Sequence, residues 1–166
     1  MNAKTHFLSG VIAGYLAETT WKGALVGGFA ALLPDIDEPK SYIGRLVPFL
    51  SVPMRAFVSH RTLTHSLLFV IVAGAVLLFV DGDMALAWMM GLLAHIMGDM
   101  LTGRVQLFWP LNVWVGLSVP RIAFGLIDRL TFFALLALVL WFCFFSSGLG
   151  VWFEKLLSLF GLLFGR

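Results

Sequence analysis

The residues best suited to chemistry in this sequence are four histidines and several aspartates near the ends of apolar stretches. His95 and Asp99 are four residues apart in a segment that we predict to be helical, so their side chains share one face with Cβ atoms about 5–6 Å apart. That spacing suits two ligands of one metal ion or of two adjacent ions. A single histidine in such a segment is more often a packing residue, so the pair needs partners from other segments.

Two carboxylates, Asp35 and Asp37, follow Pro34, which ends the preceding helix. The partial negative charge at a helix C-terminus disfavours anions. Two acids at a membrane boundary are therefore unfavourable unless a metal ion or a basic side chain compensates them. An isolated Asp-x-Asp is otherwise typical of a solvated turn, and it is the membrane setting that favours a bound cation.

A third group, from His60 to Ser66, opens the next apolar stretch and contains two histidines and an arginine. We expect His60 to lie just outside the helix that begins here and His65 to lie in its first turns. A hydroxyl side chain is needed to cap this helix. The candidate N-caps are Ser59, Thr62 and Thr64.

The elements that carry these groups must lie in a membrane, because 60% of the 166 residues are hydrophobic and only 12% are charged. A soluble domain of this size could not bury so much apolar surface. We predict an all-α, polytopic transmembrane helical bundle with short or re-entrant helices, since each apolar stretch is near or below the roughly 20 residues of a full crossing. The stretches are 7–17, 21–33, 67–80, 84–101, 130–145 and 149–164.

The proline-rich segment 35–60 and the mixed segment 105–128 are predicted to be interfacial loops or short re-entrant pieces. Residues 1–110 form the predicted metal-site membrane domain. Residues 111–166 form an interfacial loop and C-terminal membrane helices of the same compact unit. Small residues recur at helical spacing and predict close helix packing. These are Gly10 with Gly14 and Gly23 with Gly27.

Two helical hairpins would bring the candidate ligands to one face of the membrane. A single helix over 7–33 would put His6 about 43 Å from Asp35 at 1.5 Å per residue. A turn at 18–22 instead returns both to one side, and a second turn at 81–83 does the same for the two later stretches. All the candidate ligands then lie at one membrane surface.

Basic residues are predicted to gather on the ligand side, with Lys22 alone on the other, so the positive-inside rule places the site at the cytoplasmic face. A formal net charge of +2 without a basic aromatic patch argues against binding of nucleic acid. The basic residues on the ligand side are Lys4, Lys40, Arg45, Arg55, Arg61, Arg104, Arg121 and Arg129.

With this combination of residues, the chain resembles the YdjM-like family, known as LexA-regulated, membrane-bound, metal-dependent hydrolases. The resemblance runs from residue 6 to about 110. It implies a bound metal ion, hydrolase activity, a place in the bacterial inner (cytoplasmic) membrane and regulation in the SOS response. It is carried by His6 with Gly10, by Leu33 to Ser41 with Gly44 and Arg45, by His60 and Arg61 with Thr64 to Ser66, and by His95 to Asp99 with Thr102 and Leu107 to Pro110.

More distantly, a helical His-x-x-x-Asp preceded by an Asp and a His is similar to the ligand pattern of zinc-dependent phospholipase C and P1-type nucleases. Those enzymes have a later cluster of His and Glu ligands. This chain has no histidine after Asp99, which argues against a full three-zinc site.

We predict that five residues ligate one or two divalent ions. Imidazole and carboxylate ligands without thiolate suit zinc best, with manganese or iron(II) as alternatives. A water molecule on such an ion has its pKa lowered towards neutrality and can attack an electrophile that the metal also polarises. The predicted ligands are His6, Asp35, His65, His95 and Asp99.

Three further residues are predicted to act in catalysis. Asp37 and His60 are further ligands or partners of the ligands, and whichever is not a ligand could move a proton. Arg61 could hold an anionic oxygen with its guanidinium fork, which favours a phosphoester substrate at the lipid surface. The expected partners are therefore membrane lipids, with a phospholipid or a prenyl-phosphate-type compound as substrate.

Two alternatives to a hydrolase remain open. A protein that transports metal ions or protons would carry ionisable residues through the depth of its helices, but residues 69–79 and 85–94 have none. A non-catalytic protein could use a metal ion only to hold its helices together. A structural site is closed, whereas a catalytic site keeps a coordination position for water. The oligomeric state is left open.

Overall fold

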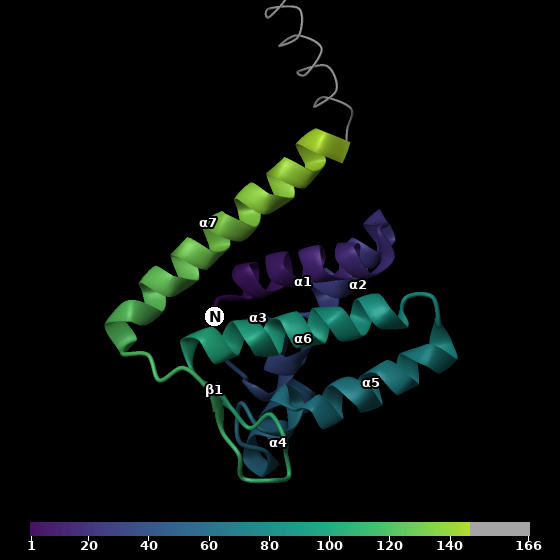
Figure 1. Ribbon diagram of the computed structural model, residues 1–166. Helices are drawn as coiled ribbons and strands as arrows, with labels where there is room; N and C mark the ends of the chain where they lie inside the picture. Colours follow the sequence, from purple (N-terminus) through teal and green to yellow (C-terminus); the bar gives the residue numbers. More distant parts are fainter. Residues whose placement is uncertain (147–166) are drawn as a thin grey trace, which may run out of the picture.

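The computed structural model describes residues 1–146, and these form a mostly helical unit (Figure 1). Seven α-helices and two short 3-10 helices precede or flank one small strand pair within this part of the chain. The helices are α1 (Ala3–Glu18), α2 (Trp21–Ala30), η1 (Leu33–Asp37), α3 (Tyr42–Leu46), α4 (Pro48–Phe57), η2 (Leu63–His65), α5 (Leu67–Val80), α6 (Ala85–Thr102) and α7 (Arg121–Ser146). The strands are β1 (Arg104–Val105) and β2 (Val115–Gly116).

Both predicted helical hairpins are confirmed. Helix α1 ends where Thr19 takes a left-handed conformation (φ 51°), and α2 begins after Thr20, whose side chain accepts a hydrogen bond from the Gly23 backbone N–H at 3.0 Å. Helix α5 ends at Val80, and the chain turns before α6. In each hairpin a polar turn separates two apolar helices, which then pack side by side.

The predicted glycine packing is also confirmed, and one glycine joins three helices. A Cβ atom on Gly10 would lie 2.3 Å from the carbonyl oxygen of Gly27, and one on Gly91 would lie 2.2 Å from the same oxygen. Gly14 faces Gly23 in the same way, at 2.2 Å. The backbones of α1, α2 and α6 therefore touch, which larger side chains would prevent.

The segment between α2 and α5 forms short helices, namely η1, α3, α4 and η2, as expected for interfacial or re-entrant structure.

The prediction for the start of α5 was wrong. Ser66 caps this helix by accepting a hydrogen bond from the Phe69 backbone N–H at 3.2 Å, so His65 lies before the helix, in η2. The hydroxyl of Thr64 is not free to cap, because it donates to Asp37 at 2.7 Å.

The region after α6 differs from the all-α prediction. Residues 104–105 pair with 115–116 as an antiparallel hairpin. Helix α7 then begins at Arg121, well before the predicted apolar stretch 130–145, so Asp128 lies inside the helix. The predicted stretch 149–164 lies outside the described residues.

Among residues 1–146, two helices are long and apolar enough to cross a membrane, namely α6 and the Ile122–Phe144 part of α7. Helix α5 is apolar but has only 14 residues, which at 1.5 Å per residue span about 21 Å of a hydrocarbon core about 30 Å thick. The helical nature of the predicted bundle is thus shown, and its polytopic arrangement stays a prediction, since the described residues hold two candidate crossings. The division at residue 110 stays a prediction.

Candidate metal centre

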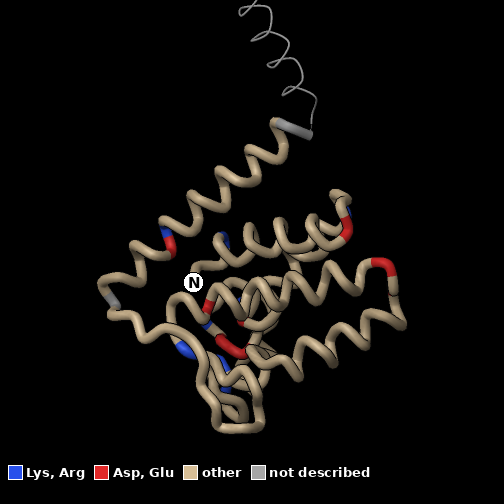
Figure 2. The backbone as a smooth tube through the Cα atoms, in the orientation of Figure 1, with Lys and Arg blue, Asp and Glu red and all other residues tan. Residues whose placement is uncertain are grey.

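The five predicted metal ligands, although up to 93 residues apart in sequence, converge where four elements meet. Figure 2 shows acidic and basic segments of separate elements gathered near the start of the chain. The ligand side chains are all buried or nearly so. They are His6 from α1, Asp35 from η1, His65 from η2, and His95 and Asp99 from α6.

Four of these residues can each offer a ligand atom within 4.8 Å of the others. The Nε2 atom of His65 lies 3.4 Å from Asp99 Oδ2 and 3.9 Å from Asp35 Oδ1. The Nε2 atom of His95 lies 3.7 Å from Asp35 Oδ1. Two imidazoles and two carboxylates surrounding one point form a donor set that suits zinc, manganese or iron(II).

Hydrogen bonds on the far sides of the rings fix the tautomers of the two central histidines. His95 Nδ1 lies 2.6 Å from the carbonyl oxygen of Ala31, which can only accept, so this nitrogen carries a proton. Thr64 donates its hydroxyl proton to Asp37, so its oxygen accepts from His65 Nδ1 at 2.9 Å. Both Nε2 atoms are therefore lone-pair acceptors in the neutral rings.

These two acceptor nitrogens nevertheless face each other at 3.1 Å, with carboxylates beside them. Two lone pairs cannot satisfy each other, and a buried polar atom without a partner is unfavourable. A cation among them would satisfy all four groups at once. The residues present therefore fit a metal ion.

His6 completes the cluster from the other side of Asp99. Its ring stacks on that of His95 with centroids 3.7 Å apart, and its Nε2 lies 3.2 Å from Asp99 Oδ1. The residue is 1% exposed, and in the described structure neither ring nitrogen has a hydrogen-bond partner. The amino group of Met1 also lies 2.6 Å from Asp99 Oδ1. His6 thus has an unpaired nitrogen available for a metal ion.

Asp35 is the most open of the five, with 18% of its side chain exposed. Burial raises the pKa of this carboxyl group, and the neighbouring Asp99 carboxylate adds to the shift. The anionic form of Asp35 therefore lacks sufficient positive charge from the side chains around it. A metal ion would supply that charge.

Asp37 and His60 lie behind His65, on its Nδ1 side. Asp37 is fully buried and lies 2.8 Å from His60 Nδ1, besides accepting from Thr64. Burial acts to raise the pKa of Asp37, but hydrogen bonds with His60 and Thr64 act to lower it, and the net effect is a lowered pKa. Burial acts to lower the pKa of His60, but Asp37 outweighs it and raises that pKa.

Asp37, His60 and His65 make a second group whose ligand atoms could all approach one ion. In that group His65 would have to use Nδ1, because its Nε2 faces the first group. That nitrogen already donates to Thr64, so the second group is better described as a hydrogen-bonded support of His65.

Arg61 reaches the cluster from a strained backbone position. Its φ of 68° is left-handed, which is uncommon for a residue with a side chain. Its Nε lies 2.9 Å from Asp99 Oδ2, and its backbone oxygen accepts from the Gln106 N–H at 2.8 Å. A Cβ atom on Gly103 would lie 1.9 Å from Arg61 Nη1. The guanidinium group thus needs a glycine beside it.

Sequence reasoning missed two groups that orient the ligands. Thr64 could have been found, because it stands next to His65 and has a hydroxyl that reaches back to its ring. The carbonyl of Ala31 could not, because a backbone oxygen has no sequence signal. The five predicted ligands themselves are brought together, and their roles stay predictions.

Comparison with known proteins identifies the family of this chain. The model of the YdjM inner membrane protein family matches residues 1–165. This chain belongs to the YdjM family. The resemblance predicted from His6 to Pro110 is thereby confirmed, and the chain is a membrane protein, as its composition predicted.

Individual YdjM relatives match parts of the chain. The inner membrane protein YdjM of Escherichia coli is 40% identical over 87 residues, which cover 48% of this chain and 44% of that protein. The uncharacterized protein YvsG of Bacillus subtilis is 33% identical over 132 residues, 72% of this chain and 79% of that protein. The chain thus spans less than half the length of the E. coli relative, and no solved structure matches it.

Proposed function

We propose that this YdjM family member is a membrane-embedded metal-dependent hydrolase that acts on a phosphoester at the lipid surface. The observation that carries the proposal is the pair of Nε2 acceptors of His65 and His95, 3.1 Å apart beside two carboxylates. A divalent ion bound there would polarise an electrophile and acidify a water molecule.

One ion, zinc in preference to manganese or iron(II), accounts for the hydrogen bonds better than two. Asp35, His65, His95 and Asp99 would hold it, and His6 would join from α1. A second ion near His60 would have to displace the hydrogen bond between His65 Nδ1 and Thr64. The Thr64 and Ala31 oxygens instead keep each central imidazole in the tautomer that leaves Nε2 free.

His60 is the proposed proton carrier. A quarter of its side chain is exposed, whereas that of Asp37 is fully buried, so His60 can exchange protons with water and Asp37 cannot. Asp37 then serves to orient His60 and to stabilise its protonated form.

Arg61 is the proposed binding group for the substrate anion. Its side chain is 23% exposed, and its Nε lies 2.9 Å from Asp99 Oδ2. The terminal N–H groups of a guanidinium can then donate to a phosphoryl oxygen. This arrangement supports a phosphoester, such as a phospholipid or a prenyl phosphate, over an uncharged substrate.

The geometry supports catalysis over the two alternatives. Two observations argue against transport. The ligands gather at one end of α6, and the preceding stretch 85–94 of this helix has no ionisable side chain. A purely structural ion would be enclosed by buried groups, whereas the side chains of Arg61 and Asp35 are 23% and 18% exposed. The excess of basic residues predicted on the ligand side supports a cytoplasmic location for the centre.

The test starts with the metal content of the purified full chain. We expect wild type to carry about one zinc per chain and His95→Ala or Asp99→Ala to carry none by elemental analysis. Asp83→Ala, which removes an exposed acid at the far turn, is the matched control and should retain the metal. Unchanged metal content in the first two variants would remove the basis of the proposal.

Activity is tested separately, with phosphorylated lipids as substrates. We expect wild type to release phosphate or a phosphorylated head group, and Asp35→Asn to lose this activity. Metal-loaded wild type that cleaves none of these lipids would reject the hydrolase while leaving the metal centre in place.

A further inference from the structure

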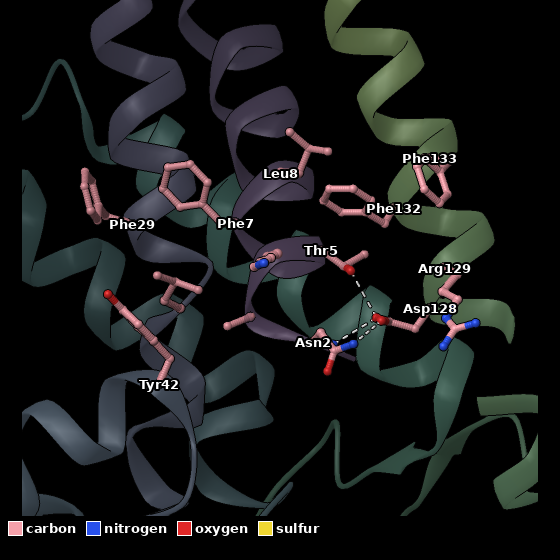
Figure 3. Close-up of a pocket in the computed structure, with 13 residues that line it drawn as sticks. Asn2, Thr5, Phe7, Leu8, Phe29, Tyr42, Asp128, Arg129, Phe132 and Phe133 are labelled. Atoms are coloured by element: carbon pink, nitrogen blue, oxygen red, sulfur yellow. Dashed lines mark hydrogen bonds between the residues drawn. The ribbon is translucent and has the colours of Figure 1, made fainter. Parts of the chain in front are cut away.

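A groove of about 1100 Å³ lies between α1, α2 and the N-terminal half of α7, apart from the metal centre. Its lining includes none of the eight predicted site residues. Figure 3 shows two layers of side chains along it. Phe7, Leu8 and Phe132 lie in an apolar layer with two more aromatic rings, whereas polar side chains form the other layer.

The polar layer carries unbalanced positive charge. Its one acid, Asp128, is 3% exposed and accepts hydrogen bonds from the Asn2 backbone N–H at 2.9 Å, from Thr5 Oγ1 at 3.0 Å, and from the Asn2 side chain. Lys4 and Arg129 are exposed and form no ion pair within residues 1–146. The groove lining therefore has a formal net charge of +1, with two cations whose charges are not paired with the one acid.

The apolar layer lies beside a candidate membrane crossing. Phe132 and Phe133 belong to α7, whose Ile122–Phe144 part is only 6% buried within the protein. Phe133 and Phe29 leave 64% and 62% of their surface exposed. A groove with apolar walls in the hydrocarbon region and two free cations at one end is complementary to a lipid with an anionic head group.

We propose that this groove binds one anionic membrane phospholipid, with its phosphate beside Lys4 and Arg129 and its hydrocarbon chain along Leu8 and Phe132. The volume of about 1100 Å³ slightly exceeds the roughly 300–1,000 Å³ of pockets for drug-sized ligands, which leaves room for a lipid chain. The site is separate from the metal centre, so binding does not depend on hydrolysis. It lies close to that centre, because Thr5 and Phe7 line the groove on either side of His6 in the chain.

Native mass spectrometry of the detergent-purified full chain tests the proposal. The probes are phosphatidylglycerol and zwitterionic phosphatidylcholine of the same chain length. We expect wild type to retain one phosphatidylglycerol with several-fold preference, and the Lys4→Ala/Arg129→Ala variant to lose that preference. Lys22→Ala, which removes an exposed cation at the start of α2, should behave as wild type.

Bulky substitutions that fill the apolar part of the groove test whether the hydrocarbon chain of the lipid binds there. Leu8→Trp should prevent retention of both lipids, and Leu16→Trp, on an exposed position of the same helix, should not. Phe133→Trp, on a residue that is already largely exposed, gives a second test if Leu8→Trp does not fold. Equal retention of the two lipids by wild type, or unchanged retention in the groove variants, would overturn the proposal.

Metal content measured on the same samples separates this proposal from the proposed function. Groove variants that lose the lipid and keep the metal support a distinct lipid site. Wild type that binds metal but shows no lipid preference would reject the groove alone, and wild type that binds lipid without metal would reject the metal centre alone.

Discussion

Thr64 decides which nitrogen of His65 is available to a metal ion. Its hydroxyl donates to Asp37 and accepts from His65 Nδ1, so the proton of the ring is held on the side away from the ligand cluster. The residue is fully buried, and its side-chain hydrogen bonds are to Asp37 and His65 rather than to the ligands of α6. Its contribution to metal binding is therefore one of orientation.

Thr64→Val should weaken zinc binding by about 10- to 100-fold, as is typical when a hydrogen-bond partner of a metal ligand is removed. Competition with a coloured zinc chelator would measure this change. Thr64→Ser retains the hydroxyl and should bind as wild type, and Thr131→Val in α7 controls for loss of a hydroxyl elsewhere. Wild-type affinity in Thr64→Val would show that the tautomer of His65 is fixed by something else.

Gly103 provides the space for the Arg61 guanidinium, since a Cβ atom there would lie 1.9 Å from Nη1. Gly103→Ala should displace Arg61 from Asp99 and lower kcat/KM for a phosphorylated lipid, with metal content unchanged. Gly125→Ala, where a Cβ atom meets nothing within 4 Å, is the control and should keep full activity. Full activity in Gly103→Ala would argue against a role for Arg61 in binding the substrate.

At the scale of elements, the contact of α1, α2 and α6 depends on Gly27. A Cβ atom on this residue would lie 2.4 Å from the Gly10 carbonyl oxygen. We expect Gly27→Ala to destabilise the protein by about 1–3 kcal/mol, the range of overpacked positions, and to reduce metal content. Unfolding in mixed micelles, followed by circular dichroism, would measure the change in stability. Stability equal to that of Gly125→Ala would contradict the prediction.

The elements that sequence reasoning predicted well are those with a strong local signal. The apolar stretch 67–80 has polar residues at both ends, and α5 has the same bounds. The His95 and Asp99 spacing depends only on helical geometry, so it survives in α6. The gathering of the ligands followed from two polar turns, because short turns between helices force them to run antiparallel.

Other elements had no such signal. The strands Arg104–Val105 and Val115–Gly116 have two residues each, too few to show a period. The start of α7 was missed because Asp128 and Arg129 interrupt the apolar run. The Asp128 carboxylate is accommodated inside that helix by hydrogen bonds from Asn2 and Thr5, which are far away in sequence. Contacts between distant residues of this kind are visible only in the folded protein.

At the scale of the whole molecule, a bound ion would connect α1, η1, η2 and α6, so metal removal should loosen the entire unit. We expect a chelator to lower the Tm of the purified chain and added zinc to restore it, because an ion that binds only the folded state stabilises it by mass action. His95→Ala should have a low Tm that the chelator does not change. A wild-type Tm that is insensitive to the chelator would argue against a bound ion.

The position of Gly27 also limits how far a tilt of α1 against α6 would displace the histidine ligands. His6 lies four residues before Gly10 and His95 lies four residues after Gly91, and both glycines rest on the same carbonyl group. Each histidine is thus about 6 Å along its helix axis from the contact with the Gly27 carbonyl oxygen, about which the two helices would pivot. Rocking α1 against α6 by about 10° would move either imidazole by only about 1 Å, while the distant helix ends sweep through larger arcs.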